Sequence, residues 1–399
     1  MLQRRLGTAD AVVIGLGSML GAGVFVVFVP AAAVAGWGLL AGLAVAGAVA
    51  YCNAISSARL AARHPRSGGA YVYGRECPGD FWGFLAGWSF VVGKTASCAA
   101  MALTVGLYVW PRGANALAVA AVVALTAVNY RGIGKSALLT RVIVAFVLAV
   151  LAAVVVVIAG SGRAEIAFSA AGVGTGQVLQ AAGLLFFAFA GYARIATLGE
   201  EVRDPERTIP HAIPLALGVT LGVYAAVALS LLSILGPAAL GSTATPLADA
   251  VRVAGAPGLE PIVRTAAAVA AAGSLLSLML GVSRTSLAMA RDGHLPRALS
   301  AVHPRFGVPH RAELAVAAVV AGVAAVSDVR AAIGFSSFAV LVYYAIANAA
   351  AWTLGRRAIP MAGLTGCLVV AACLPAGSVF GGVAVLAIGG TVYLLRRFR

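Results

Sequence analysis

Runs of about 20 apolar residues, each enough to cross roughly 30 Å of hydrocarbon, recur along nearly the whole chain. Of the 399 residues, 61% are hydrophobic and only 10% are charged, whereas soluble proteins average about 25% charged residues. Backbone N–H and C=O groups inside lipid must be satisfied within the protein, and a helix satisfies them within one segment. The sequence therefore predicts an all-α polytopic membrane protein embedded in a lipid bilayer.

Twelve transmembrane helices are predicted from these runs, of which the fourth, ninth and eleventh are short. They cover residues 11–33, 37–60, 80–109, 115–130, 136–159, 176–199, 212–235, 262–289, 312–327, 331–353, 359–374 and 377–395.

The basic residues between the spans give the chain its expected orientation. Twenty lysines and arginines fall on the side of the N-terminus and five on the opposite side. Because cytoplasmic loops carry the excess of basic residues, both termini are expected in the cytoplasm and the protein in the cell membrane. No cleavable signal is expected, because the first apolar run continues too long for one. The net charge of +15 does not indicate a nucleic-acid partner, since the basic residues are spread between apolar runs.

Residues that could carry chemistry inside the bilayer are missing from the predicted spans. The acidic residues lie in loops or near helix ends, and the five histidines lie outside the spans. The five cysteines have no metal-ligand spacing. A membrane-embedded enzyme would need a general acid or base or a metal cluster there. We therefore expect neither an enzyme nor a bound metal or cofactor.

The stretch GLGSMLGAGVF, from Gly15 to Phe25, places four glycines inside the first predicted span. Each costs a helix interior roughly 1 kcal/mol relative to alanine. One interpretation is a helix broken at mid-membrane, whose free N–H and C=O groups bind a charged substrate. The other is close helix packing of the GxxxG kind, which the spacing of Gly17 and Gly21 also fits.

A second segment favours the broken helix. It runs from Phe186 to Ile213, with Gly191 inside an apolar run and a polar hairpin after it. It belongs to the sixth span, five helices after the first. Interrupted helices in corresponding places of two halves indicate an inverted-repeat transporter. We therefore predict a core over residues 1–353, with halves at about 11–159 and 176–353, followed by two C-terminal helices in 354–399. Free amides for a carboxylate and free carbonyls for an ammonium suit a zwitterionic amino acid.

Four motifs resemble the amino acid–polyamine–organocation (APC) superfamily of permeases. They are GSMLGAGVF in the first span, HPRSGGAYVYGRECPG (64–79) after the second, FAFAGYARIATLGEEVRDPERTIPHAI (187–213) in the sixth, and SRTSLAMARDGHLPRALSAVHPRFGVPHRA (283–312) ending the eighth. The resemblance covers the first ten helices, and the last two match only in hydropathy.

The resemblance implies a substrate pocket between the first, third, sixth, eighth and tenth helices. It implies that backbone N–H groups receive the substrate carboxylate and backbone carbonyls receive its α-amino group. The amides are those of Gly21, Ala22 and Gly23, and the carbonyls those of Met19, Phe187 and Ala190. Phe187 is then an aromatic gate, or else a packing residue, and Phe189 and Tyr192 line the pocket for the substrate side chain.

This chain departs from the family at positions that decide substrate and coupling. Arginine/agmatine antiporters of this family have an acidic residue two positions after the sixth-helix glycine, where this chain has Ala193 followed by Arg194. A neutral amino acid is therefore expected. Proton-coupled relatives and some exchangers carry a lysine in the fifth helix, where this chain has Val147.

Lys94, about midway along the third span, is the replacement candidate for coupling. A buried ammonium without a carboxylate partner is costly, and losing its proton relieves that cost, so Lys94 could carry a proton. Alternatively, Lys94 donates to carbonyls of a broken helix or snorkels to the membrane surface.

Three other polar side chains in the eighth span have two interpretations each. Ser274 and Ser277, one turn apart, could help to bind sodium, or they could bond back to their own helix. Arg284 is expected to snorkel or to contact the hairpin at Glu200 and Glu201.

Taken together, these features predict a bacterial secondary active transporter of a neutral amino acid, with proton symport favoured over exchange. The bacterial origin is inferred from the preference for arginine over lysine and from the high alanine content. An amino acid exchanger or exporter, or an amine or polyamine carrier of the same fold, is the alternative. No obligate protein partner is expected, because the predicted outer loops contain no cysteine for a linked subunit.

Overall fold

The computed structural model describes residues 7–63, 69–77, 79–132, 137–166, 172–192, 195, 202 and 204–397. Within those residues the chain is helical and contains no β-strand. The α-helices are α1 (Thr8–Met19), α2 (Gly23–Val26), α3 (Phe28–Ala35), α4 (Leu39–Arg63), α5 (Ala70–Glu76), α6 (Asp80–Val109), α7 (Ala114–Tyr130), α8 (Ala137–Gly160), α9 (Thr175–Phe189), α11 (Pro205–Ser242), α12 (Pro246–Val253), α13 (Glu260–Arg291), α14 (His310–Val326), α15 (Val329–Trp352), α16 (Ala358–Ala372) and α17 (Ala376–Arg397).

Nine segments of the described chain are long and apolar enough to cross a membrane. They are Thr8–Val26, Phe28–Arg63, Asp80–Val109, Pro111–Tyr130, Leu138–Gly160, Arg207–Ser242, Pro257–Arg291, Val329–Trp352 and Ala376–Arg396, and the helices Thr175–Phe189 and Ala358–Ala372 are apolar but shorter. The prediction of an all-helical membrane protein is confirmed. The count of twelve crossings, the repeat and the division at residue 353 remain predictions.

Several helix boundaries differ from those expected. The first span, predicted as 11–33, is divided among α1, α2 and α3. The seventh, predicted as 212–235, extends from Pro205 to Ser242, with a kink at Gly236, whose φ of 70° is non-helical. Pro237 follows that kink, and its ring disfavours a helical conformation at the residue before it. The sixth, predicted as 176–199, ends at Phe189 as α9, and of residues 193–203 the structure describes only 195 and 202.

Two short helices lie where loops were expected. α5 follows the second span, and α12 precedes the eighth. Each is too short to cross a membrane, so the hydropathy of the chain does not reveal them. α12 buries Leu247 and Val251 on one face and leaves Arg252 exposed, which is the pattern of a helix lying against a protein surface.

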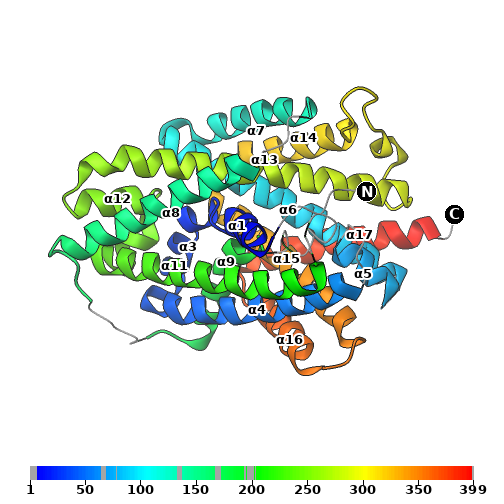
Figure 1. Cartoon of the computed structure of the whole chain (residues 1–399), viewed down its shortest axis with the longest axis horizontal. Helices are drawn as coiled ribbons and strands as arrows, with labels where there is room; N and C mark the ends of the chain where they lie inside the picture. The colour runs from blue at the N-terminus through cyan, green and yellow to red at the C-terminus, as the bar shows by residue number, and fades with distance from the viewer. Residues whose placement is uncertain are drawn as a thin grey trace.

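α6 is central to the packing, because α5, α7, α13, α14, α15 and α17 all lie against it. Small residues permit this closeness. A Cβ atom on Gly93 would lie 2.8 Å from that of Ala339 in α15, and the hydroxyl oxygens of Ser97 and Ser336 are 2.5 Å apart. Small residues and hydroxyl pairs are the usual means by which helices associate in lipid. A second group, α4, α9 and α11, packs around α3, and α1 packs against α11 (Figure 1).

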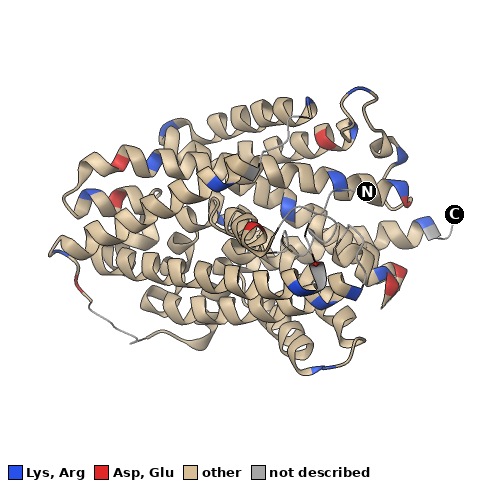
Figure 2. Ribbon diagram, viewed as in Figure 1, with Lys and Arg blue, Asp and Glu red and all other residues tan. Residues whose placement is uncertain are grey.

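The charged residues gather mainly at the two ends of the helices, and the middle of the molecule carries few of them (Figure 2). This distribution fits a slab of hydrocarbon across the middle of the helices. Against that background, a charged side chain placed midway along a helix requires an explanation of its own.

Candidate substrate site at the helix interruption

The first helix is interrupted where the glycines are concentrated. α1 ends at Met19 and α2 begins at Gly23, and the residues between them leave the helical pattern. The N–H groups at the start of α2 have no acceptor within that helix, and the last carbonyls of α1 have no helical donor. The interruption therefore leaves main-chain donors and acceptors without helical partners at one buried place, inside a segment long enough to cross a membrane.

The end of α9 meets this interruption directly. A Cβ atom on Gly23 would lie 2.8 Å from the Cβ of Ala188, and one on Gly191 would overlap the carbonyl oxygen of Ser18. Glycine is needed at both positions because backbone approaches backbone. The contact brings together two segments that the sequence analysis proposed independently, and it does so through the glycines that singled them out.

Two of the expected acceptor carbonyls already hold a donor from the protein. The hydroxyl of Tyr224, in α11, lies 2.6 Å from the Met19 carbonyl and 3.1 Å from that of Ala188. The ammonium of Lys94 donates to the Ala190 carbonyl at 3.2 Å. Phe187 lies in the last turn of α9, so its carbonyl also lacks a helical donor.

Sequence reasoning missed Tyr224. The signal available was slight: it is the only tyrosine in α11 and sits within an apolar run.

The aromatic side chains expected at the pocket are packed against neighbouring helices. The rings of Phe189 and Tyr224 meet edge to face, with centroids 5.2 Å apart. Tyr192 stacks on Tyr344 of α15, again with 5.2 Å between centroids. Phe187 keeps 7% of its surface exposed, whereas Phe189 and Tyr192 are fully buried. Phe189 and Tyr192 therefore rest against α11 and α15, and Phe187 has the freest side chain of the three.

Lys94 is 6% exposed, and it forms no ion pair with any carboxylate in the described chain. The cation instead faces the C-terminal end of α9, where the helix dipole and the unpaired carbonyls favour positive charge. The contact with Ala190 is the one that the sequence analysis held open as a structural alternative to coupling.

The other polar candidates contact groups other than Lys94. Ser274 of α13 stands beside Gly21, since a Cβ on that glycine would overlap its hydroxyl. The hydroxyl of Ser277 donates to Gly273 in its own helix at 3.1 Å. Arg284 interacts with Glu313, a fully buried residue of α14, and the expected partner hairpin at 200–201 lies outside the described residues, as do Ala193 and Arg194. No three described His, Cys, Asp or Glu side chains are grouped as metal ligands.

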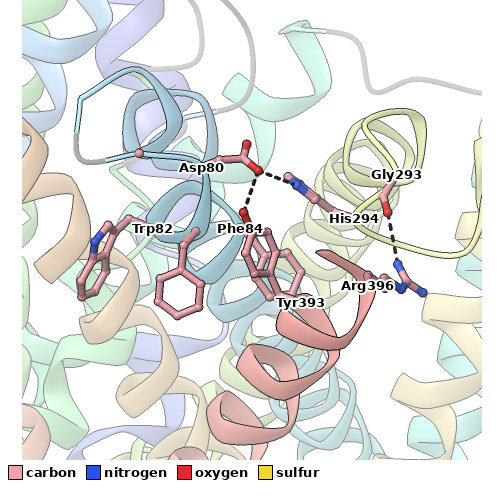
Figure 3. A pocket seen from close by; sticks show the side chains of 9 residues that line it. Asp80, Trp82, Phe84, Gly293, His294, Tyr393 and Arg396 are labelled. Carbon is pink, nitrogen blue, oxygen red and sulfur yellow. Dashed lines mark hydrogen bonds and ion pairs between the residues drawn. The ribbon is translucent and has the colours of Figure 1, made fainter. Parts of the chain in front are cut away.

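A second polar cluster lies at the beginning of α6, beside a hollow of about 680 Å³ (Figure 3). Asp80 accepts from Arg75 and from the hydroxyl of Tyr393, both at 2.9 Å, and faces the His294 ring at 3.4 Å. Arg75 also donates to Asp292 at 2.7 Å. The cluster links α5, α6, α17 and the turn after α13 through side chains that the sequence analysis did not single out.

The predicted substrate contacts lie elsewhere. They line neither this hollow nor a larger one, of about 980 Å³, formed mainly by apolar side chains of α6, α14 and α15. All of them are buried. The interruption is therefore closed to bulk solvent in this conformation, and a solute could reach it only after helices move apart.

An all-helical membrane protein in which a buried helix interruption meets the end of another helix has an arrangement typical of membrane transporters. Comparison with known proteins agrees. The family model for amino acid permeases matches residues 6–391. An uncharacterized transporter of Mycobacterium tuberculosis is 69% identical over 99% of this chain and 92% of its own length.

More distant relatives carry names that state a substrate. A branched-chain amino acid permease of Bacillus subtilis is 27% identical over 77% of this chain and 72% of its own length. Human cationic amino acid transporter 4 is 29% identical over 86% of this chain and 58% of its own length. The chain belongs to the amino acid permease family, within the APC superfamily suggested by its motifs. It is a transporter and not an enzyme.

Proposed function

We propose that this protein is a secondary active transporter that carries a neutral amino acid across the plasma membrane by alternating access. The observation that carries the proposal is the buried meeting of two helix ends, where α1 stops at Met19 and α9 stops at Phe189. Main-chain groups released at such an interruption can bind both ends of a zwitterion. The twelve-helix inverted repeat and the cytoplasmic termini form part of the same proposal.

In this proposal the substrate lies along the interruption. The amides of Gly21, Ala22 and Gly23 hold its carboxylate, and the carbonyls of Met19, Phe187 and Ala190 hold its ammonium. Because these contacts are main-chain, they recognise what all amino acids share. In the same proposal the Phe187 ring closes over the bound molecule, and Phe189 and Tyr192 define the space for the substrate side chain.

We propose a neutral amino acid as the substrate because of the positive charge already present at the site. Lys94 already places one positive charge at the end of α9, with no described carboxylate to balance it. A second cation on the substrate side chain would be repelled strongly in a medium of low dielectric constant. The names of the relatives do not decide between classes, since one is a branched-chain and another a cationic amino acid carrier.

We propose the proton as the coupling ion, with Lys94 as its carrier. Lysine changes protonation readily on burial, whereas arginine does not. Sodium is the weaker candidate. Of the two serines considered for sodium, Ser274 lies at the interruption, and the Ser277 hydroxyl is bonded within its own helix.

The test is transport by the purified protein in liposomes, with the twenty amino acids as competitors, with and without a pH gradient. We expect neutral amino acids to compete and arginine and lysine not to compete. A pH gradient should alter the rate, and a sodium gradient should not. Absence of transport or binding for all twenty would overturn the proposal, and transport of polyamines alone would favour the amine carrier instead.

A further inference from the structure

The C-terminal end of α9 already holds a cation. α9 ends at Phe189, and the carbonyl of Ala190 immediately beyond it accepts from the Lys94 ammonium at 3.2 Å. The last carbonyls of a helix lack backbone donors and form the negative end of its dipole. Lys94 therefore occupies the same position that the ammonium of a bound amino acid would require.

The surroundings give Lys94 no other counter-charge among the described residues. The thiol of Cys98, one turn along α6, is the titratable group that acts electrostatically on Lys94. Several titratable side chains of the helices packed against α6 contact groups other than Lys94. Tyr343 accepts from the amide of Ala70, and Tyr344 lies against Tyr192.

Other titratable groups on the helices around α6, or beside their ends, also contact partners other than Lys94. Those pairs are Tyr71 with Asp292, Arg75 with Asp80 and Asp292, Tyr130 with His303 and His310, Arg264 with Glu260, Arg330 with the carbonyl of Gly241, Tyr393 with Asp80, and Arg396 with the carbonyl of Gly293. Arg284 acts electrostatically on the buried carboxyl of Glu313 without forming an ion pair with it.

We propose that the protonated Lys94 side chain and the ammonium of the substrate are mutually exclusive occupants of the Ala190 carbonyl. This inference rests on the proposed function and specifies its coupling. Two unit charges sharing one carbonyl would lie within a few ångströms of each other, in a buried place where their repulsion is poorly screened. Substrate loading therefore removes the proton from Lys94.

Competition of this kind makes the transporter a proton–substrate exchanger. On the side where the substrate enters, Lys94 gives its proton to water, the neutral amine moves away, and the substrate ammonium bonds to the carbonyl. On the other side the substrate leaves, and Lys94 takes a proton from water there. One proton and one amino acid cross in opposite directions, so an inward proton gradient drives the amino acid outward. Symport, which the sequence analysis favours, would require both to be bound together.

The experiment measures binding and proton release on the purified full-length protein in detergent. The probe is L-leucine, or the amino acid that competes best in liposomes if leucine does not bind. Calorimetry in buffers of different ionisation enthalpy gives the Kd and the number of protons released between pH 5.5 and 8.5. For wild type we expect the release of close to one proton per bound amino acid at the acidic end of this pH range. There the Kd should rise as the pH falls, approaching about tenfold per pH unit.

Two variants of Lys94 separate the possibilities. Lys94→Gln has no proton to lose, so it should bind the probe at least as tightly as wild type, with no proton release and no pH dependence. Lys94→Arg keeps its charge at every pH, so it should bind on the order of 100-fold more weakly, as expected from a few kcal/mol of repulsion. Arg284→Gln, a matched removal of a basic residue from α13, should retain proton release. A thermal melt of each variant reports whether it is folded.

The outcomes are distinct. Tight binding by Lys94→Arg together with proton uptake on binding would overturn exchange and establish symport. Equal weakening of both variants with proton release intact would reduce Lys94 to a structural role. If no amino acid binds wild type, the proposed function itself fails. In liposomes, an acidic exterior should accelerate efflux of preloaded probe from wild type but not from Lys94→Gln.

Discussion

Two charged residues of α6 stand about 21 Å apart along the helix axis and have opposite surroundings. Asp80, at the first position of α6, is 51% exposed and contacts Arg75, His294 and Tyr393. Lys94, fourteen residues later, is 6% exposed and has one backbone carbonyl. The carboxylate at the helix end has three side-chain partners, whereas the ammonium in the middle has no charged partner in the described chain.

The difference separates charges that serve the fold from a charge that serves transport. At a partly exposed site, water and several partners all stabilise the charge. Each ion pair therefore contributes little to the free energy of unfolding, usually below about 1 kcal/mol. A charge at membrane depth costs several kcal/mol, and such residues persist mainly where function requires them. The comparison predicts that changes around the interruption abolish transport, and that changes around Asp80 alter stability slightly and transport hardly at all.

The largest effect is expected from Gly191→Val. The new side chain would meet the backbone of Ser18 and Met19, which cannot rotate away as a side chain can. The Ala190 carbonyl would then move away from Lys94, and transport should fall by at least about 100-fold, because small misplacements in a site carry such costs. Uptake by liposomes measures the rate. Gly281→Ala, in open space on α13, is the matched control and should keep wild-type transport. Wild-type transport by Gly191→Val would remove the interruption from the mechanism.

An intermediate effect is expected from Tyr224→Phe. The change removes the hydroxyl placed between the carbonyls of Met19 and Ala188 and leaves the ring in place. A buried acceptor left without a donor costs about 1–3 kcal/mol. The midpoint of thermal unfolding should fall, and the Kd for the transported amino acid should change by up to about 100-fold.

Tyr51→Phe provides the control for that measurement, because Tyr51 is 46% exposed on α4 and holds neither carbonyl. An unchanged Kd and an unchanged melting midpoint for Tyr224→Phe would mean that the two carbonyls need no donor from α11.

The helix interruption and the importance of Lys94 could be predicted from the sequence, because each depends on the residues of a single helix. Four glycines weaken one helix wherever it packs, and a lysine within an apolar run is costly whatever surrounds it. The partners of these groups could not be predicted. Tyr224 reaches Met19 across 205 positions of the chain, and Lys94 reaches Ala190 across 96. Such pairs are determined by how the helices pack, and the hydropathy of the chain does not predict that packing.

The cluster around Asp80 shows the same limit. Its members come from four separate parts of the chain, and α5, which supplies Arg75, is too short for a hydropathy pattern to reveal.

The smallest effect is expected from Arg75→Gln, which breaks the contacts of that side chain with both Asp80 and Asp292. Arg75 is 39% exposed, so water replaces much of what is lost. The free energy of unfolding should fall by about 1 kcal/mol or less, and 1 M salt should shrink the difference by screening the pairs in wild type. Transport should stay within about twofold of wild type, since no change is made at the interruption. Arg112→Gln, at an exposed position between α6 and α7, is the control for loss of a positive charge alone. If Arg75→Gln instead stopped transport while leaving the protein folded, the cluster at the end of α6 would belong to the moving parts. The difference between Asp80 and Lys94 would then lie in the conformational state in which each acts, and not in how deeply each is buried.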